Sequence, residues 1–290
     1  MGKIFGELFV NGILLGGVFA LFSIGLTLIF GIVKIVNFAH GEYIMLGMYA
    51  TFWLFQLAGI NPYLSIILVG PLFFFLGYLS QKVVIQPILK APNVAQLFTT
   101  VGLGIVLQNI ALIFWSADPR SIQNLFGGAQ GFEIVGINIS YAELLAFLIA
   151  VSMNIAVFAF LKYTKLGKSL RATAQDLQAA RLMGVNVNRI YWIAFAISSA
   201  CVGVAGSVII PIYPASPTVG VNFALIAFVV VILGGITNVN GTFLAGIIIG
   251  IIDSFAGYFL PSVFKETSFF IILLLILWFR PTGLFARIAA

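Results

Sequence analysis

Residues 8–33 read LFVNGILLGGVFALFSIGLTLIFGIV, an apolar stretch without a charged side chain. A helix needs about 20 apolar residues to cross the hydrocarbon core of a bilayer, so this stretch is long enough to span a membrane. The rest of the chain has the same character: 62% of its 290 residues are hydrophobic and only 8% are charged. A soluble domain carries roughly 25% charged residues and could not bury this much apolar surface. The composition therefore indicates a polytopic membrane protein.

Eight more apolar runs follow the first, and Pro, Gly or Asn marks the breaks, as at Asn61-Pro62 and Pro261. The runs are continuous rather than alternating, which excludes a transmembrane β-barrel. We expect an all-α fold with about eight to ten transmembrane helices, forming one transmembrane domain over residues 1–290. The runs are Leu8–Val33, Tyr43–Ile60, Tyr63–Ser80, Val94–Trp115, Ala142–Leu161, Ile190–Ile212, Val219–Ile236, Thr242–Leu260 and Ser262–Phe279.

Basic residues gather on one side of this arrangement. If the loop Gln81–Asn93 is cytoplasmic, alternation places eleven of the fourteen Lys and Arg residues inside, and six of these lie in residues 162–189. Cytoplasmic loops carry such an excess, so we expect the N-terminus outside and the C-terminus in the cytoplasm. The bias also explains the net charge of +6 without a nucleic-acid partner. The sizeable external segment, Ser116–Ser140, is too short for a domain.

The sequence offers no complete set of residues for covalent chemistry. His40 and Glu42 form a His-x-Glu pair, but a zinc deaminase also needs two downstream cysteines, and the chain has only Cys201. A His-based zinc site needs a second His. Gly167-Lys168-Ser169 resembles the end of a nucleotide-binding loop, but the first glycine of that motif would fall at Lys162. We expect no catalysis, metal or cofactor in this chain.

The basic segment 162–189 contains a weakly amphipathic stretch. Its apolar residues recur at three- and four-residue steps, as on one face of a helix, and Gly184 is expected to end that helix. The helix either lies on the membrane surface against anionic lipid or docks a soluble partner, which small residues would allow to approach closely. The apolar stripe consists of Leu166, Leu170, Ala174, Leu177 and Ala180.

Several motifs spread over the chain point to one family. Gln178-Ala179-Ala180-x-x-x-Gly184 is similar to the Glu-Ala-Ala-x-x-x-Gly loop by which permeases of bacterial ATP-binding-cassette importers engage their ATPases, but it has Gln for Glu and lacks the downstream Leu-Pro. Residues 25–42, GLTLIFGIVKIVNFAHGE, closely resemble the first hairpin of branched-chain amino-acid permeases of the LivH type. Further matches are Ala91-Pro92, residues 100–109, Gly167-x-x-x-Arg171-Ala172, Leu233-Gly234-Gly235-Ile236 and Arg280-Pro281-Thr282-Gly283-Leu284-Phe285. Urea and short-amide permeases share much of this pattern.

The resemblance implies the permease fold of an importer that moves branched-chain or other hydrophobic amino acids into the cytoplasm. ATP would be hydrolysed by separate subunits, and the chain would be a multi-pass protein of the inner or plasma membrane. The implied partners are a second permease chain (related but different), two cytoplasmic ATPases and an extracytoplasmic substrate-binding protein, besides membrane lipid. The ATPase contact carries over to Arg171, Asp176, Ala179, Ala180 and Gly184.

A polar turn, Asn37-Phe38-Ala39-His40-Gly41-Glu42, joins the first two runs. It is either an ordinary cytoplasmic turn, with Asn37 or His40 capping the next helix and Glu42 favouring the helix dipole, or the inner mouth of a translocation path. In the second case His40 and Glu42 could pair and change state with the gate. The residues before this turn, Gly31-Ile-Val-Lys-Ile-Val-Asn37, have a short match in Gly235-Ile-Thr-Asn-Val-Asn240, which hints at a second irregular turn at Asn238, Asn240 and Gly241.

Asp253 lies inside an apolar run and should face protein or water, because a charge in hydrocarbon is costly. It either bonds a neighbouring helix or lines the path. A zwitterionic substrate favours amide and hydroxyl groups, and Gln108, Asn109 and Asn238 are compatible with that role. Gly12-x-x-x-Gly16 and Gly246-x-x-x-Gly250 favour close helix packing.

Two other classes of protein stay open at this point. In an ATP-independent channel or secondary transporter, Asp253 or Glu42 would carry coupling protons or sodium. Such a protein does not need a docking helix that ends at Gly184. The basic segment therefore distinguishes it from a permease of an ATP-driven importer. An intramembrane enzyme is disfavoured, because no paired catalytic set is present.

Overall fold

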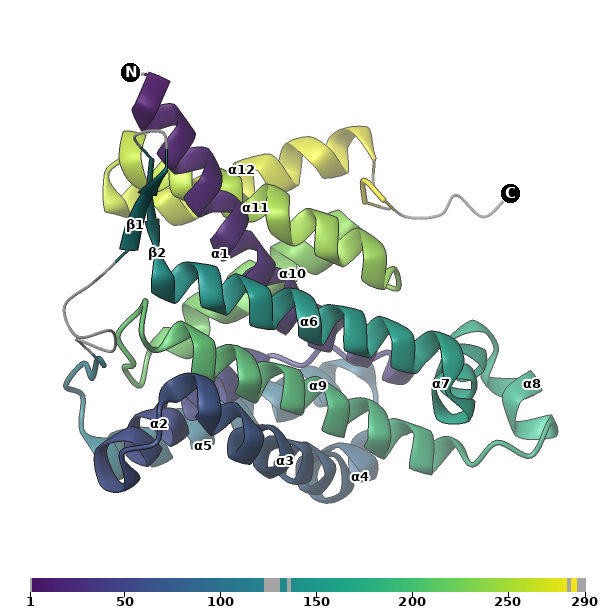
Figure 1. The fold of residues 1–290 in the computed structure, drawn as a ribbon. Helices are drawn as coiled ribbons and strands as arrows, with labels where there is room; N and C mark the ends of the chain where they lie inside the picture. Colours follow the sequence, from purple (N-terminus) through teal and green to yellow (C-terminus); the bar gives the residue numbers. More distant parts are fainter. Residues whose placement is uncertain (1, 123–130, 135–136, 281–282, 286–290) are drawn as a thin grey trace.

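The computed structural model describes residues 2–122, 131–134, 137–280 and 283–285 and places a helix at each of the nine apolar runs. The helices lie side by side in one bundle (Figure 1). The N-terminus and a β-hairpin lie at one end of the bundle, called the hairpin end, and two short helices mark the opposite, α7–α8 end. The helices at the runs are α1 (Gly2–Leu28), α2 (His40–Ala58), α3 (Pro62–Ser80), α5 (Asn93–Trp115), α6 (Tyr141–Tyr163), α9 (Val187–Ile209), α10 (Val219–Gly234), α11 (Val239–Phe259) and α12 (Ser262–Phe279).

Six of the described helical segments are long and apolar enough to cross a membrane by length and composition. They contain α1, α3, α5, α6, α9 and α11. Helix α10 is apolar but has only 16 residues, and α2 begins with the polar residues His40 and Glu42. The polytopic all-helical fold expected from the apolar runs is therefore confirmed.

Helices α1 and α11 pack in close contact, and glycines allow it. A Cβ atom added at Gly12 would lie 2.6 Å from Cα of Ile251, and one at Gly16 would lie 2.6 Å from Cα of Ile247. On the partner helix, a Cβ at Gly246 would lie 2.7 Å from Cα of Ala20. The two Gly-x-x-x-Gly motifs thus face each other, which confirms their predicted packing role.

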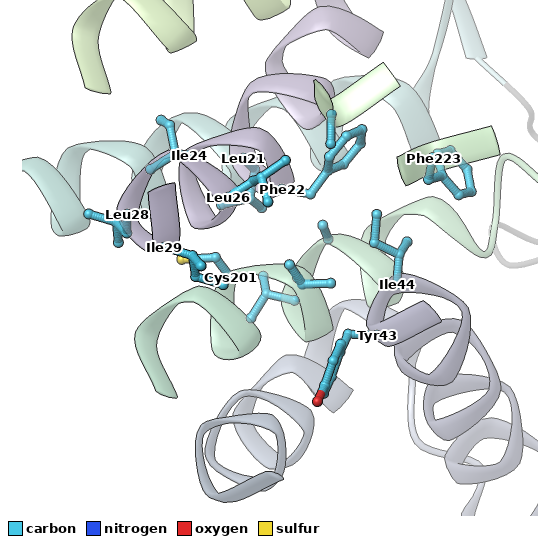
Figure 2. Close-up of a cluster of buried hydrophobic side chains, with 14 of the residues drawn as sticks. Leu21, Phe22, Ile24, Leu26, Leu28, Ile29, Tyr43, Ile44, Cys201 and Phe223 are labelled. Carbon is cyan, nitrogen blue, oxygen red and sulfur yellow. The ribbon is translucent and has the colours of Figure 1, made fainter. Parts of the chain in front are cut away.

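Around this contact, α1, α2, α9 and α10 enclose the apolar core. Figure 2 shows Phe22 of α1, Ile44 of α2 and Phe223 of α10 gathered in it, together with Cys201 of α9. All four side chains are at most 5% exposed. Such burial suits the apolar residues and leaves the lone cysteine far from solvent.

The predicted loop after α3 is wrong, because the helix continues where the loop was expected. A π-helical turn, η2 (Gln81–Ile85), and a short helix, α4 (Gln86–Ile88), extend α3 without a break. Gln81 is buried, and its Nε2 donates to Oε1 of Gln86 at 2.9 Å. The connection to α5 is therefore short, and Lys82 lies within the helix.

The segment predicted to lie outside contains a small antiparallel hairpin. Strands β1 (Gly131–Ile134) and β2 (Ile137–Ser140) pair with Phe132 opposite Ile139, and Phe132 packs on Tyr141 at the start of α6. Close by, Arg120 bridges to Ala215 through two backbone hydrogen bonds of 2.8 and 2.7 Å. These contacts tie together the connections at the hairpin end.

Candidate functional site

The first two helices are joined by a segment that turns back into the bundle. Helix α1 ends in a π-helical turn, η1 (Ile29–Val33), and Lys34 reverses the chain with a left-handed φ of 61°. Helix α2 then begins at His40, whose Nε2 lies 2.8 Å from the carbonyl oxygen of Phe22. Phe22 and Val33 are about 16 Å apart along the helix axis at a rise of 1.5 Å per residue. Helix α2 therefore starts well inside the bundle, beside the C-terminal half of α1.

Three polar side chains of this turn are almost fully buried. Asn37 is 2%, His40 1% and Glu42 5% exposed. The possible pairing of His40 with Glu42 is not formed, because His40 bonds to the α1 backbone instead. The expected capping is also wrong: Ala39 is the N-cap of α2 and provides no side-chain hydrogen bond. Within the described part of the chain, Asn37 Oδ1 and Glu42 Oε2 have no hydrogen-bond partner.

Helices α10 and α5 close around Glu42. A Cβ at Gly220, in the first turn of α10, would lie 2.5 Å from Glu42 Oε2, and one at Gly104 of α5 would lie 3.6 Å from Glu42 Cγ. Gly41 is equally confined, since a Cβ there would overlap the carbonyl oxygen of Gly220. We call Asn37, His40, Gly41 and Glu42 the inner turn. The N-termini of α2 and α10 meet at it, deep in the bundle.

The amides of α5 that the sequence added to this set lie elsewhere. Gln108 is half-buried, whereas Asn109 is exposed and donates its amide to the carbonyl of Ile105 in its own helix. Besides Gly104, Thr100 of α5 contacts the segment directly before the inner turn, because its hydroxyl donates to the carbonyl of Val36 at 3.0 Å. Sequence reasoning gave no role to Thr100 or Gly220, although both lie in segments it had singled out.

The second irregular turn is confirmed between α10 and α11. Gly235 adopts a φ of 90°, and Asn238 Oδ1 accepts the backbone N–H of Gly241 as the N-cap of α11. The Asn238 amide also donates to the carbonyl of Phe285 at 2.6 Å, and Leu284 N–H donates to the carbonyl of Leu233 at 2.8 Å. The closing motif of the chain is thus fastened to this turn.

Asp253 faces protein, as expected from the cost of a charge in hydrocarbon. It is 3% exposed, and its Oδ2 lies 3.0 Å from Nζ of Lys265 on α12. This ion pair was missed at the level of sequence, although Lys265 is the basic residue nearest to Asp253 along the chain. The two residues line a cavity of about 170 Å³ among α1, α10, α11 and α12.

The basic segment 162–189 forms two helices rather than the single helix expected. Helix α7 (Lys165–Gln175) ends before Asp176, whose carboxylate accepts the N–H groups of Gln178 and Ala179 and so caps α8 (Leu177–Leu182). An N-cap Asp breaks the helical path because its own backbone is extended. Gly184 ends α8 with a φ of 79°, as predicted.

The predicted docking residues differ in exposure. Arg171 is exposed and reaches the carbonyl of Lys162 at 3.4 Å, whereas Ala180 is only 4% exposed. Two apolar neighbours that sequence reasoning missed, Leu182 and Met183, are 89% and 84% exposed. Helix α8 projects from the bundle (Figure 1), so these side chains form an apolar tip on a basic segment.

Comparison with known proteins connects these features to a family. Residues 8–279 match the model of the family described as the branched-chain amino acid transport system / permease component. The chain belongs to this family. The permease has relatives that cover almost its full length. It is 28% identical to the high-affinity branched-chain amino acid transport system permease protein LivH of Escherichia coli and 30% identical to BraD of Pseudomonas aeruginosa.

Both alignments cover 96% of the permease and 94% of the relative. A probable LivH of Methanocaldococcus jannaschii is 28% identical over 88% of the permease and 82% of the relative. No solved structure gives a significant match. The assignment to this family therefore rests on sequence similarity, and the helical fold agrees with it.

Proposed function

We propose that the permease is the membrane-spanning subunit of an ATP-driven importer that passes branched-chain amino acids into the cytoplasm. The observation that carries this proposal is the family match over residues 8–279, supported by relatives whose names state this transport. Urea and short amides have no such support among these relatives. The permease would itself be non-catalytic, and its location would be the cell membrane.

The orientation follows from charge. Six basic residues lie in residues 162–189, which form the α7–α8 end, and such an excess marks the cytoplasmic side of a membrane protein. The hairpin end would then face outward, toward a substrate-binding protein, and the C-terminus would lie in the cytoplasm. Substrate would enter at the hairpin end and leave at the α7–α8 end.

The α7–α8 pair is the proposed contact with the ATPase subunits. Arg171, Asp176, Ala179, Ala180 and Gly184 were proposed from the family motif. The exposed Leu182 and Met183 add an apolar tip of the kind that inserts into a groove of a partner. Asp176 and Ala180 would act by shaping α8, since one caps it and the other packs beneath it. A rigid short helix can transmit ATPase closure to the membrane helices.

The inner turn is the proposed gate. Two helix N-termini meet there around buried polar groups, an arrangement that places partial positive charge and open hydrogen-bond capacity inside the bundle. Movement of α10 relative to α2 would open or close this contact. Asn238 and Asp253 belong to the same proposed path, and Gln108 and Asn109 would line it only where a second permease chain covers α5.

The experiment combines purification with transport. The permease is purified from its native membrane, its bound subunits are identified, and uptake of labelled leucine is measured in proteoliposomes with the purified binding protein. We expect co-purified ATPase subunits and ATP-dependent uptake that valine and isoleucine compete, while urea and acetamide do not. Uptake without ATP, or competition by urea alone, would contradict the proposal.

A matched pair of substitutions tests the docking tip. Leu182→Ser should reduce the recovered ATPase and ATP-driven uptake several-fold, because it removes the most exposed apolar side chain of α8. Leu166→Ser on α7 makes the same chemical change at a residue that is 38% exposed, and it should have a smaller effect. Equal effects of the two variants would remove the argument for the tip. Gly184→Arg should also release the ATPase.

A further inference from the structure

The cavity beside Asp253 combines an ion pair with apolar walls: the side chain of Asp253 is 4% exposed and that of Lys265 is 30% exposed. Its volume is about 170 Å³, and Phe19, Phe223, Ile226 and Phe269 are among the side chains that line it. A cavity of about 150 Å³ is large enough for benzene, so this one accommodates a slightly larger molecule. Tyr213 and Asn222 add polar groups to the lining.

The ion pair has hydrogen-bond capacity to spare. In the described part of the chain, the Asp253 carboxylate and the Lys265 ammonium bond to each other at 3.0 Å and make no other hydrogen bond or ion pair. A carboxylate offers about four acceptor positions, and an ammonium group has three donors. Burying the Asp253 carboxylate costs desolvation energy that an apolar side chain of similar volume would avoid. The spare capacity of the pair therefore suits a ligand that carries both charges.

An apolar α-amino acid has matching chemistry. Its ammonium and carboxylate are both bonded to the α-carbon, so the first can contact Asp253 while the second contacts Lys265. Its hydrocarbon side chain can then pack against Phe223 and Ile226. We propose that this cavity binds the amino acid in transit. The permease itself would then recognise the two charged groups and select for the size of the side chain. The inference rests on the proposed function and extends it to a defined site.

The position of the cavity agrees with this role. Asp253 and Phe259, the last residue of α11, are about 9 Å apart along the helix axis. The site is thus near the hairpin end, where substrate would enter. Helix α10 lines it with Phe223 and Ile226, while Gly220 of the same helix rests against Glu42 of the inner turn. A ligand in the cavity therefore contacts the helix whose N-terminus closes the proposed gate.

The first test fills the cavity and leaves the ion pair in place. Val229 is 1% exposed and lines the cavity, whereas Val221 of the same helix is 47% exposed and is not among the lining residues. Binding of labelled L-leucine is measured on the purified permease–ATPase complex without binding protein. Val229→Phe should weaken this binding by at least about tenfold, or 1.4 kcal/mol, and Val221→Phe should leave it within about twofold. Equal binding by the wild type and Val229→Phe would overturn the inference.

The second test asks whether the site recognises both charges of the amino acid. We expect 4-methylpentanoate, which lacks the ammonium group, and 3-methylbutylamine, which lacks the carboxylate, to compete at least about tenfold less well than leucine. Competition equal to that of leucine would show that the ion pair does not read the zwitterion. The double variant Asp253→Asn/Lys265→Gln should lose leucine binding. If it folds and binds leucine like the wild type, the ion pair is purely structural and the inference is wrong.

The outcomes separate this inference from the proposed function. If the complete importer transports leucine but the complex without binding protein does not bind it, the cavity site is excluded and the transport function stands. If the complete importer transports no branched-chain amino acid, the proposed function itself fails. Leucine binding that Val229→Phe abolishes, with uptake reduced in parallel, would support both.

Discussion

At the scale of single residues, the contact of Gly41 with α10 is the closest approach at any glycine in the part of the chain that the structure describes. A Cβ atom at this position would overlap the carbonyl of Gly220 and approach the backbone of Ala224. Backbone cannot move aside as a flexible side chain can, so α2 and α10 would have to separate. The glycine therefore sets how closely the two helix N-termini approach.

Gly41→Ala should lower stability by about 1–3 kcal/mol, the usual cost of overpacking a filled interior, and should impair uptake more than ATPase binding. Thermal unfolding of the purified permease and leucine uptake measure the two effects. Gly102→Ala on α5 is the control, because a Cβ there meets no atom within 4 Å. Equal behaviour of the two alanine variants would show that the α2–α10 contact is looser than described.

Asn238 shows how one side chain fixes a turn and a distant segment together. Its Oδ1 caps α11 at 3.2 Å, and its Nδ2 donates to Phe285 at 2.6 Å. Asn238→Asp keeps the cap but loses the donor, while Asn238→Ala loses both. We expect a cost of about 1 kcal/mol for each lost interaction, so Ala should destabilise more than Asp, as measured by thermal unfolding. The reverse order would show that the cap contributes nothing.

At the scale of elements, the sequence was sufficient to predict which segments form helices. It was insufficient to predict how deep in the bundle a helix begins. Continuous apolar runs specify helices whatever their neighbours, because unpaired backbone groups are too costly in hydrocarbon. The start of α2 is different: the hydrogen bond between His40 and Phe22 places it deep in the bundle. That bond joins residues 18 positions apart on separate helices, so no local pattern encodes it.

The break between α7 and α8, in contrast, could have been predicted from the sequence. Asp is among the preferred N-cap residues, and Asp176 precedes the short stretch that became α8. The apolar repeat from Leu166 to Ala180 hid this signal, because it continues across the break. The Asp253–Lys265 pair was harder to predict, since it depends on how α11 and α12 pack. A charged residue in an apolar run indicates that it has a partner, but the sequence does not show which residue that partner is.

The cap at Asp176 predicts a separable effect on coupling. Asp176→Ala should cost about 1 kcal/mol of local stability in α8 and raise hydrogen exchange at Gln178 and Ala179, whose N–H groups it binds. Asp176→Asn retains an acceptor oxygen and should preserve both exchange protection and uptake. If the Asn variant loses ATPase binding as fully as the Ala variant, the charge contacts the partner and the cap is secondary.

At the scale of the whole molecule, the two ends of the bundle have different chemistry. One end carries the hairpin and the N-terminus, and the other carries the basic α7–α8 pair (Figure 1). The cavity with its ion pair is near the first end, and the fastened α10–α11 turn contacts the closing motif of the chain. Helix α10 connects the cavity to the inner turn, so a bound substrate and an ATPase-driven movement would act on the same element.

The orientation of these ends can be measured with single cysteines introduced at each end, because the native cysteine of the chain is buried. Cys201 is the one cysteine of the sequence and is 1% exposed, so the wild type should resist a membrane-impermeant maleimide in intact cells. Lys168→Cys, on exposed α7, should be labelled only after the cells are opened, and Asp118→Cys, exposed at the hairpin end, should be labelled in intact cells. The opposite pattern would invert the permease in the membrane. It would place the basic segment away from any cytoplasmic ATPase and contradict the orientation inferred from the charge bias.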